Sequence, residues 1–275
     1  MALVFLVLFL QGCSTSLAYN HLDWLAQWYL ADYVDLNSEQ DEKLQDSLTD
    51  ILSWHRQREL LVYQQQLATL LVDVDKKMPA KRWSSHMSQL RDHFSRVREK
   101  VSVQLTQLAP LLSKEQANEF FDNLEQKNQQ DVDEYNDLSA QERQEKTYDE
   151  LYDTLDENLG SVNSAQEKLI TQFIQDTPTD TLAYIDYRRK IQNQARSIFV
   201  KEKGQALTDR LYELFMSSEQ YKSELLKQNS ATKTKLTAIL LQDIHQSLSN
   251  KQLRYFKEEV AEFRLTLRTL MVAGA

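Results

Sequence analysis

A short helix-start signature occurs four times in this chain, and its copies alternate between two types. Residues Leu36–Gln40 resemble Val162–Gln166, and residues Leu112–Gln116 resemble Leu248–Gln252. In a capping box, the side chain of the cap residue accepts a hydrogen bond from the backbone N–H of the third helical residue. The side chain of that third residue in turn accepts a hydrogen bond from the backbone N–H of the cap residue. We therefore predict four helix starts, with glutamines that serve helix ends rather than a ligand: Asn37 with Gln40, Ser113 with Gln116, Asn163 with Gln166, and Ser249 with Gln252.

The alternating order of the boxes suggests an internal duplication. Residues that flank the second and fourth boxes also match, because Leu108 and Phe120 have the same spacing from their box as Ile244 and Phe256. We interpret the pattern as two related helical halves. The alternative is a set of independent helices that happen to share good caps.

Composition favours an all-α protein. The chain of 275 residues has only 4 glycines and 3 prolines, whereas turn-rich β folds and phosphate-binding loops need residues that reach positive φ cheaply. A hydrophobic content of 41% is enough for a sizeable core in one or two domains. The net charge of −9 argues against nucleic acid as a partner, because phosphate binding requires basic surfaces.

Apolar periodicity predicts long antiparallel helices. The first should cover Tyr19–Val34, and the second should run from the Asn37 cap to about Lys77, since Pro79 stops it. Two later helices each carry an apolar seam with steps of three and four, which favours packing on a partner helix. The seams are Met87, Leu90, Phe94, Val97, Val101, Leu105 and Leu108, and then Leu253, Phe256, Val260, Phe263, Leu267 and Leu270.

The N-terminus resembles the leader of a bacterial lipoprotein. The apolar run Ala2–Leu10 is shorter than the roughly 20 residues that a membrane-spanning helix needs, and it is followed by Gln11, Gly12 and Cys13. The resemblance implies removal of the leader, diacylation of Cys13, and, with Ser14 next, a place in the outer membrane facing the periplasm. Cys13 is the only cysteine, so we expect no disulfide.

These signals divide the chain into five parts. Residues 138–161 are strongly acidic with a thin apolar stripe, which predicts a connecting helix with a solvated face. The expected parts are a signal peptide (1–12), a lipid-anchored tether with an aromatic first helix (13–35), a first helical half (36–137), the acidic connecting helix (138–161) and a second helical half (162–275).

A dense polar and aromatic constellation is the candidate site. If the first helix packs on the second, Asp32 or Asp35 can pair with Arg56 or Arg58. We favour a structural clasp with the tryptophan rings in the core over a site for a peptide or polar ligand. Contact of the first helix with the membrane interface is a third possibility. The residues are Trp24, Trp28, Tyr29, Asp32, Asp35, Trp54, His55, Arg56, Arg58 and Tyr63.

Enzyme chemistry has little support in the sequence. None of the 5 histidines has the spacing of a zinc site, and we expect His86 and His93 to form a solvated or core-edge pair. No serine lies in a nucleophile elbow, and no carboxylate has an apolar setting that would tune a general acid. We therefore predict no catalytic residues, no metal and no cofactor.

In the second box of each pair, the Gln is followed four residues later by an aromatic residue, Phe120 or Phe256. The paired boxes resemble the Leu-Thr-x-x-Gln boxes of the Spy/CpxP group of periplasmic proteins. The stretch Tyr19–Leu36 with Trp54–Arg56 is similar to an uncharacterised family of Gram-negative lipoproteins. The first resemblance implies a curved all-helical protein that holds unfolded clients or damps envelope stress signalling. The alternative is a scaffold or adaptor that binds one periplasmic or outer-membrane protein of an assembly machine.

Overall fold

The computed structural model describes residues 18–272, and this part of the chain is helical without any strand, as predicted. The expected leader (1–12) and Cys13 lie outside the described residues. The elements are α3 Leu22–Ala31, α4 Ser38–Trp54, the π-helical turn η1 His55–Glu59, α5 Leu60–Asp73, α6 Ala80–Leu108, η2 Ala109–Leu111, α7 Lys114–Asp137, α8 Ala140–Leu159, α9 Ser164–Asp176, α10 Thr181–Lys201, α11 Gly204–Met216, η3 Ser218–Tyr221, α12 Glu224–Ser247 and α13 Asn250–Val272.

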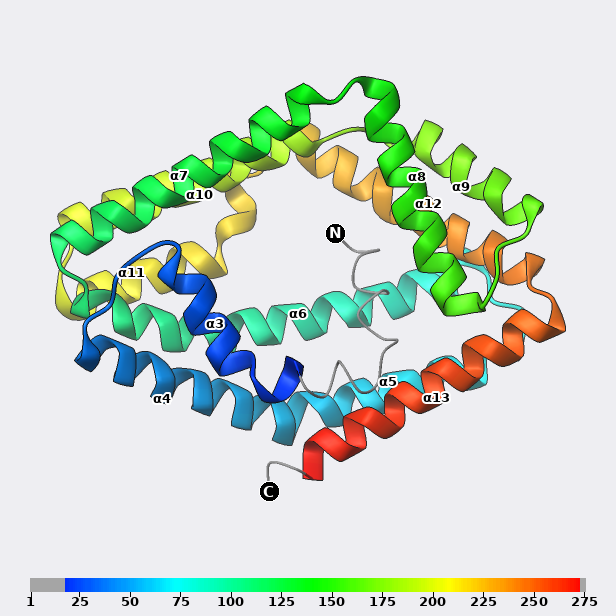
Figure 1. Cartoon of the computed structure of the whole chain (residues 1–275), viewed down its shortest axis with the longest axis horizontal. Helices are drawn as coiled ribbons and strands as arrows, with labels where there is room; N and C mark the ends of the chain where they lie inside the picture. Colours follow the sequence, from blue (N-terminus) through cyan, green and yellow to red (C-terminus); the bar gives the residue numbers. More distant parts are fainter. Residues whose placement is uncertain (1–17, 273–275) are drawn as a thin grey trace.

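The long helices pack as pairs whose members are far apart in the sequence, and the pairs form an open frame (Figure 1). Helix α7 lies along α10 on one side of the frame, and α5 lies along α13 on the opposite side. Helix α6 passes through the middle, where it packs against α4, α11 and α12. Residues 36–137 and 162–275 are therefore interleaved, because each segment supplies helices that pack on the other.

Several predicted boundaries need small corrections. The first helix is shorter than Tyr19–Val34, because α3 covers only Leu22–Ala31. The predicted second helix is continuous from α4 through η1 into α5, but it ends at Asp73 rather than near Lys77. Helix α8 ends at Leu159 and is capped by Gly160, as predicted, whose φ of 69° is the left-handed conformation that favours glycine at a helix C-terminus.

Helix α6 does not bury its predicted apolar seam. Its buried residues are Trp83, His86, His93, Ser102 and Thr106, whereas seam residues such as Phe94 and Leu105 are 39% and 40% exposed. The prediction was wrong because a single seam assumes a single partner helix. Because α4, α11 and α12 all pack against α6, the residues that it buries are mostly polar.

The other predicted seams do reach the core. In α13, Phe263, Leu267 and Leu270 are buried against Leu60 of α5. The thin stripe of the acidic helix α8 packs with α9 and α12 through Leu151, Leu155, Leu159, Ile170, Leu240 and Ile244. None of the helices that the structure describes is both long enough and apolar enough to cross a membrane.

Candidate functional site

Helix α3 presents an aromatic face to solvent. Trp24 and Trp28 are each 60% exposed, and Tyr29 is 58% exposed. The helix is held on α4, where Asp23 accepts a hydrogen bond of 3.1 Å from Gln45. The expectation that the tryptophan rings lie in the core is therefore wrong. Large exposed aromatic side chains gathered on one short helix are typical of a contact surface.

The predicted ion pair between the first and second helices is also wrong. Asp23 lies opposite Gln45 and Tyr19 lies opposite His55, so α3 runs antiparallel to α4. At about 1.5 Å per residue, Asp32 is roughly 18 Å further along α3 than Asn20. Asp32, Asp35 and Arg58 are exposed. The two aspartates lie near the first capping box rather than near η1.

A different clasp joins residues just before α3 to the turn η1. The Arg56 guanidinium donates to Asn20 Oδ1 at 2.9 Å and lies 5.3 Å from the centre of the Tyr19 ring. The imidazole of His55 hydrogen-bonds the Tyr19 hydroxyl at 2.7 Å through Nδ1 and the Tyr63 hydroxyl at 3.2 Å through Nε2. The ring of Trp54 lies 6.3 Å from His55. Sequence reasoning found His55, Arg56 and Tyr63 but missed Tyr19 and Asn20 as their partners.

The clasp is electrically neutral apart from Arg56. Burial raises the pKa of Tyr19 to about 12, although the nearby Arg56 charge opposes that rise. Burial also lowers the pKa of His55, since desolvation disfavours the imidazolium. A neutral His55 can accept a hydrogen bond from one tyrosine hydroxyl and donate one to the other. This arrangement fixes side chains and offers no nucleophile or activated base.

Next to the clasp, η1 buries a charged pair. Glu59 is only 3% exposed, and its carboxylate accepts two hydrogen bonds from Arg96 of α6, at 2.7 and 2.8 Å. Arg96 also donates to His93 Nδ1 at 2.5 Å, and His93 Nε2 bonds the Gln66 side chain. This network ties α6 to η1 and α5. Single π-helical turns often occur at functional sites, but here Arg56 and Glu59 both have structural partners.

The histidines of α6 are buried rather than solvated. His93 is 4% exposed and His86 is 7% exposed, and His86 Nε2 lies 3.0 Å from Asp73 Oδ2. Burial is the main cause that lowers the pKa of both imidazoles. Within residues 18–272, no group of His, Cys, Asp and Glu side chains is arranged to hold a metal ion.

All four predicted capping boxes form, and they meet in pairs. Gln40 Nε2 donates to Gln116 Oε1 at 2.9 Å and to the Leu111 carbonyl at 2.7 Å, while Gln116 Nε2 donates to the Asp35 carbonyl at 2.7 Å. Each of these glutamines therefore caps its own helix and also bonds the segment that enters the other helix.

The third and fourth boxes repeat this arrangement at the opposite end of the frame (Figure 1). Gln252 Nε2 donates to Gln166 Oε1 at 2.9 Å and to the Ser161 carbonyl at 3.0 Å, and Gln166 Nε2 donates to Ser247 Oγ at 3.1 Å. Gln166 is fully buried and Gln252 is 3% exposed. We call the two contacts the first and second glutamine pairs.

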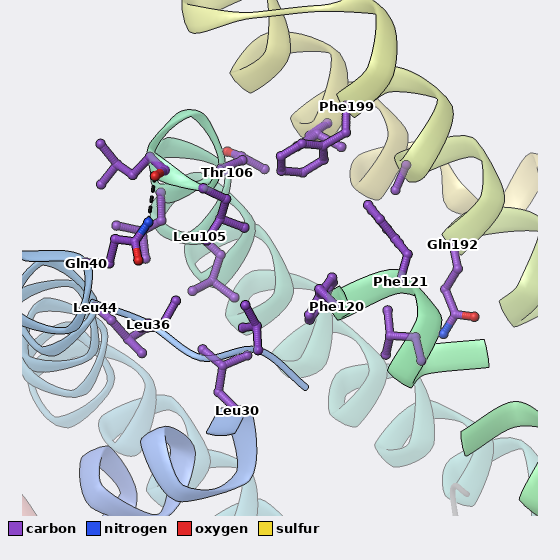
Figure 2. A pocket seen from close by; sticks show the side chains of 18 of the residues that line it. Leu30, Leu36, Gln40, Leu44, Leu105, Thr106, Phe120, Phe121, Gln192 and Phe199 are labelled. Carbon is purple, nitrogen blue, oxygen red and sulfur yellow. Dashed lines mark hydrogen bonds between the residues drawn. The ribbon is translucent and has the colours of Figure 1, made fainter. Parts of the chain in front are cut away.

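An apolar cavity of about 300 Å³ lies beside the first glutamine pair. Residues of α3, α4, α6, η2, α7, α10 and α11 line it, and no lining side chain is charged. Figure 2 shows lining side chains from Gln40 and Leu44 on one side to Gln192 and Phe199 on the other.

Comparison with known proteins identifies a family without revealing an activity. The model of a family of unknown function, DUF6279, matches residues 32–227, which is more than half of the chain. No curated protein matches the chain, and no solved structure does so either. This protein belongs to the DUF6279 family of unknown function.

Proposed function

We propose that this protein is a non-enzymatic helical lipoprotein that binds other proteins of the cell envelope. In this proposal, Cys13 carries the lipid and holds the chain in the outer membrane, facing the periplasm. The apolar run before Cys13 supports the anchor. The described residues support a binding role rather than catalysis, since the histidines and acids near η1 are engaged in buried structural contacts.

The first candidate activity is that of a Spy/CpxP-like chaperone or envelope-stress modulator. The glutamine pairs support two related halves, because every glutamine bonds the residue two positions before the opposite cap, through a backbone carbonyl in three cases and the Ser247 hydroxyl in the fourth. Helix α3 precedes the first box as α8 precedes the third, and both pack on the helix that follows. An internal duplication of this kind would place two box pairs in one chain.

The observation that carries the binding role is the exposed aromatic face of α3. Burying large aromatic rings supplies much of the energy of a protein interface, and Trp and Tyr are enriched at such contacts. Trp24, Trp28 and Tyr29 are all more than half exposed. This face lies close in sequence to Cys13, which would keep it near the membrane surface.

A double variant tests this role. We expect Trp24→Ser with Trp28→Ser to keep the fold, because both rings are 60% exposed, and to lose suppression of client aggregation. The matched control is Leu225→Ser with Leu265→Ser, since both leucines are 61% exposed on other helices. Activity of the tryptophan variant equal to that of the control and the wild type would contradict the proposal.

The second candidate is a scaffold or adaptor that binds one folded partner. The exposed aromatic rings are concentrated on a short helix, which suits one defined interface better than a broad client-holding surface. Suppression of aggregation for several unrelated clients would favour the chaperone. Crosslinking to one dominant envelope protein, with no suppression, would favour the adaptor.

A further inference from the structure

The cavity beside the first glutamine pair is a feature that neither candidate function uses. It is lined by seventeen apolar side chains and three polar ones, Gln40, Thr106 and Gln192. The packing of the helices in the frame does not require a cavity at this place. Near the second glutamine pair, leucines and isoleucines pack around the fully buried Ile170.

The polar groups at the cavity wall are already engaged. Gln40 bonds Leu111 and Gln116, and the Thr106 hydroxyl donates to the Ser102 carbonyl at 2.7 Å. The side-chain oxygen of Gln192 accepts a hydrogen bond of 2.6 Å from Asn128. A polar ligand would have to compete with these bonds and would meet no charged group. The wall therefore selects an occupant without hydrogen-bonding atoms.

The size and shape of the cavity favour an elongated apolar chain as its ligand. The lining runs from Leu44 of α4 past Phe120 to Phe199 of α10, with side chains on both sides (Figure 2). Leu105 and Leu111 line the cavity and are 40% and 43% exposed, which places an entrance beside α6 and η2.

We propose that this cavity binds one unbranched acyl chain, with its polar head left outside at the entrance beside Leu105 and Leu111. A cavity of about 300 Å³ lies at the small end of the range for ligand pockets, which suits a single chain of medium length. A free fatty acid and one chain of a phospholipid share this chemistry. The inference rests on the cavity alone and does not depend on the proposed role of α3.

The test uses the full chain with Cys13→Ser, so that no acyl chain of its own can compete. Dodecanoate should raise the melting temperature with increasing concentration and bind saturably in calorimetry with a negative heat-capacity change. Adamantane-1-carboxylate, which is compact and similarly apolar, should bind at least tenfold more weakly. Recovery of lipid from phosphatidylglycerol vesicles would identify a phospholipid as the source, and binding of dodecanoate alone would identify a free fatty acid.

Variants connect the binding to the cavity. Ala195 lines the cavity and is 5% exposed, so Ala195→Met should fill it and weaken dodecanoate binding at least tenfold. The exposed Ala206 on α11 supplies the matched control Ala206→Met, which should bind as the wild type does. If Ala195→Met does not fold, Leu105→Asn at the partly exposed entrance should also weaken binding.

Three results would overturn the inference. The first is the absence of saturable dodecanoate binding to the folded protein. The second is binding of adamantane-1-carboxylate as tight as that of dodecanoate. The third is wild-type affinity in the folded Ala195→Met or Leu105→Asn variant.

Discussion

Gln166 is a buried amide with three roles. Its side-chain oxygen accepts a hydrogen bond from the Asn163 backbone at 2.9 Å and another from Gln252, and its nitrogen donates to Ser247. A buried amide that loses its partners leaves several groups unsatisfied at once. The glutamines therefore have a structural role beyond a helix cap, and the sequence pattern alone indicates only the cap.

We expect Gln166→Ala to lower the free energy of unfolding by about 2–4 kcal/mol, because it removes the glutamine half of the capping box and the buried hydrogen bonds to Gln252 and Ser247. Glu142→Ala is the matched control. Glu142 closes the box at Ser139 but is exposed, so its loss should cost only ~0.5–1 kcal/mol. Urea denaturation of both variants measures the difference, and equal losses would show that the glutamine pair adds nothing to capping.

The Glu59–Arg96 pair gives a second prediction at this scale. Arg96→Met leaves the carboxylate of Glu59 buried without its bidentate partner and should destabilise the protein by ~3–5 kcal/mol. The exposed pair of Lys257 with Asp75 is the comparison, and Lys257→Met should cost ~1 kcal/mol or less. Chemical denaturation measures the free energy of unfolding of both variants. A loss of stability for Arg96→Met as small as that for Lys257→Met would contradict the structural role of Glu59.

At the scale of the elements, α6 has the least predictable surroundings. Periodicity correctly identifies the apolar residues that share one face of α6. It does not indicate how many helices surround that face. Instead α6 buries His86 and His93, which contact Asp73 and Gln66 of α5. Local signals predicted its start after Pro79 and its end near Pro110, because proline acts on the adjacent backbone.

Burial of imidazoles makes stability depend on pH. His55, His86 and His93 have lowered pKa values in the folded protein, so the unfolded chain binds more protons below its ordinary histidine pKa of 6.5. The stabilisation is fully present above that value and falls as the pH decreases toward the folded values. Urea unfolding should show a lower free energy at pH 5.5 than at pH 7.5.

A variant isolates the contribution of α6. His93→Gln should flatten the loss between these two pH values, whereas His21→Gln, at an exposed position, should leave it unchanged. Each imidazole can change the slope by at most ~1.4 kcal/mol per pH unit. An unfolding free energy that is the same or higher at pH 5.5 would contradict the burial of neutral histidines.

At the scale of the whole molecule, the sequence predicted the helices and their caps but not their arrangement. Capping boxes depend on residues three positions apart, so Asn37, Ser113, Asn163 and Ser249 all act as expected. The clasp between Tyr19 and His55 and the cavity depend on which distant helices meet. Neither has a local signal. The exposure of Trp24 has the same cause, since aromatic periodicity suits a core and a contact surface equally well.

The most direct test of the proposed function is photo-crosslinking in cells, with Cys13 unchanged. A photoreactive amino acid at the position of Trp28 should form adducts with envelope proteins. The same probe at Tyr184, which is 37% exposed on α10, should not do so. Protein adducts that are specific to the Trp28 position are the predicted result. Adducts with lipid alone, or the same protein adducts from both positions, would contradict a protein-binding role for α3.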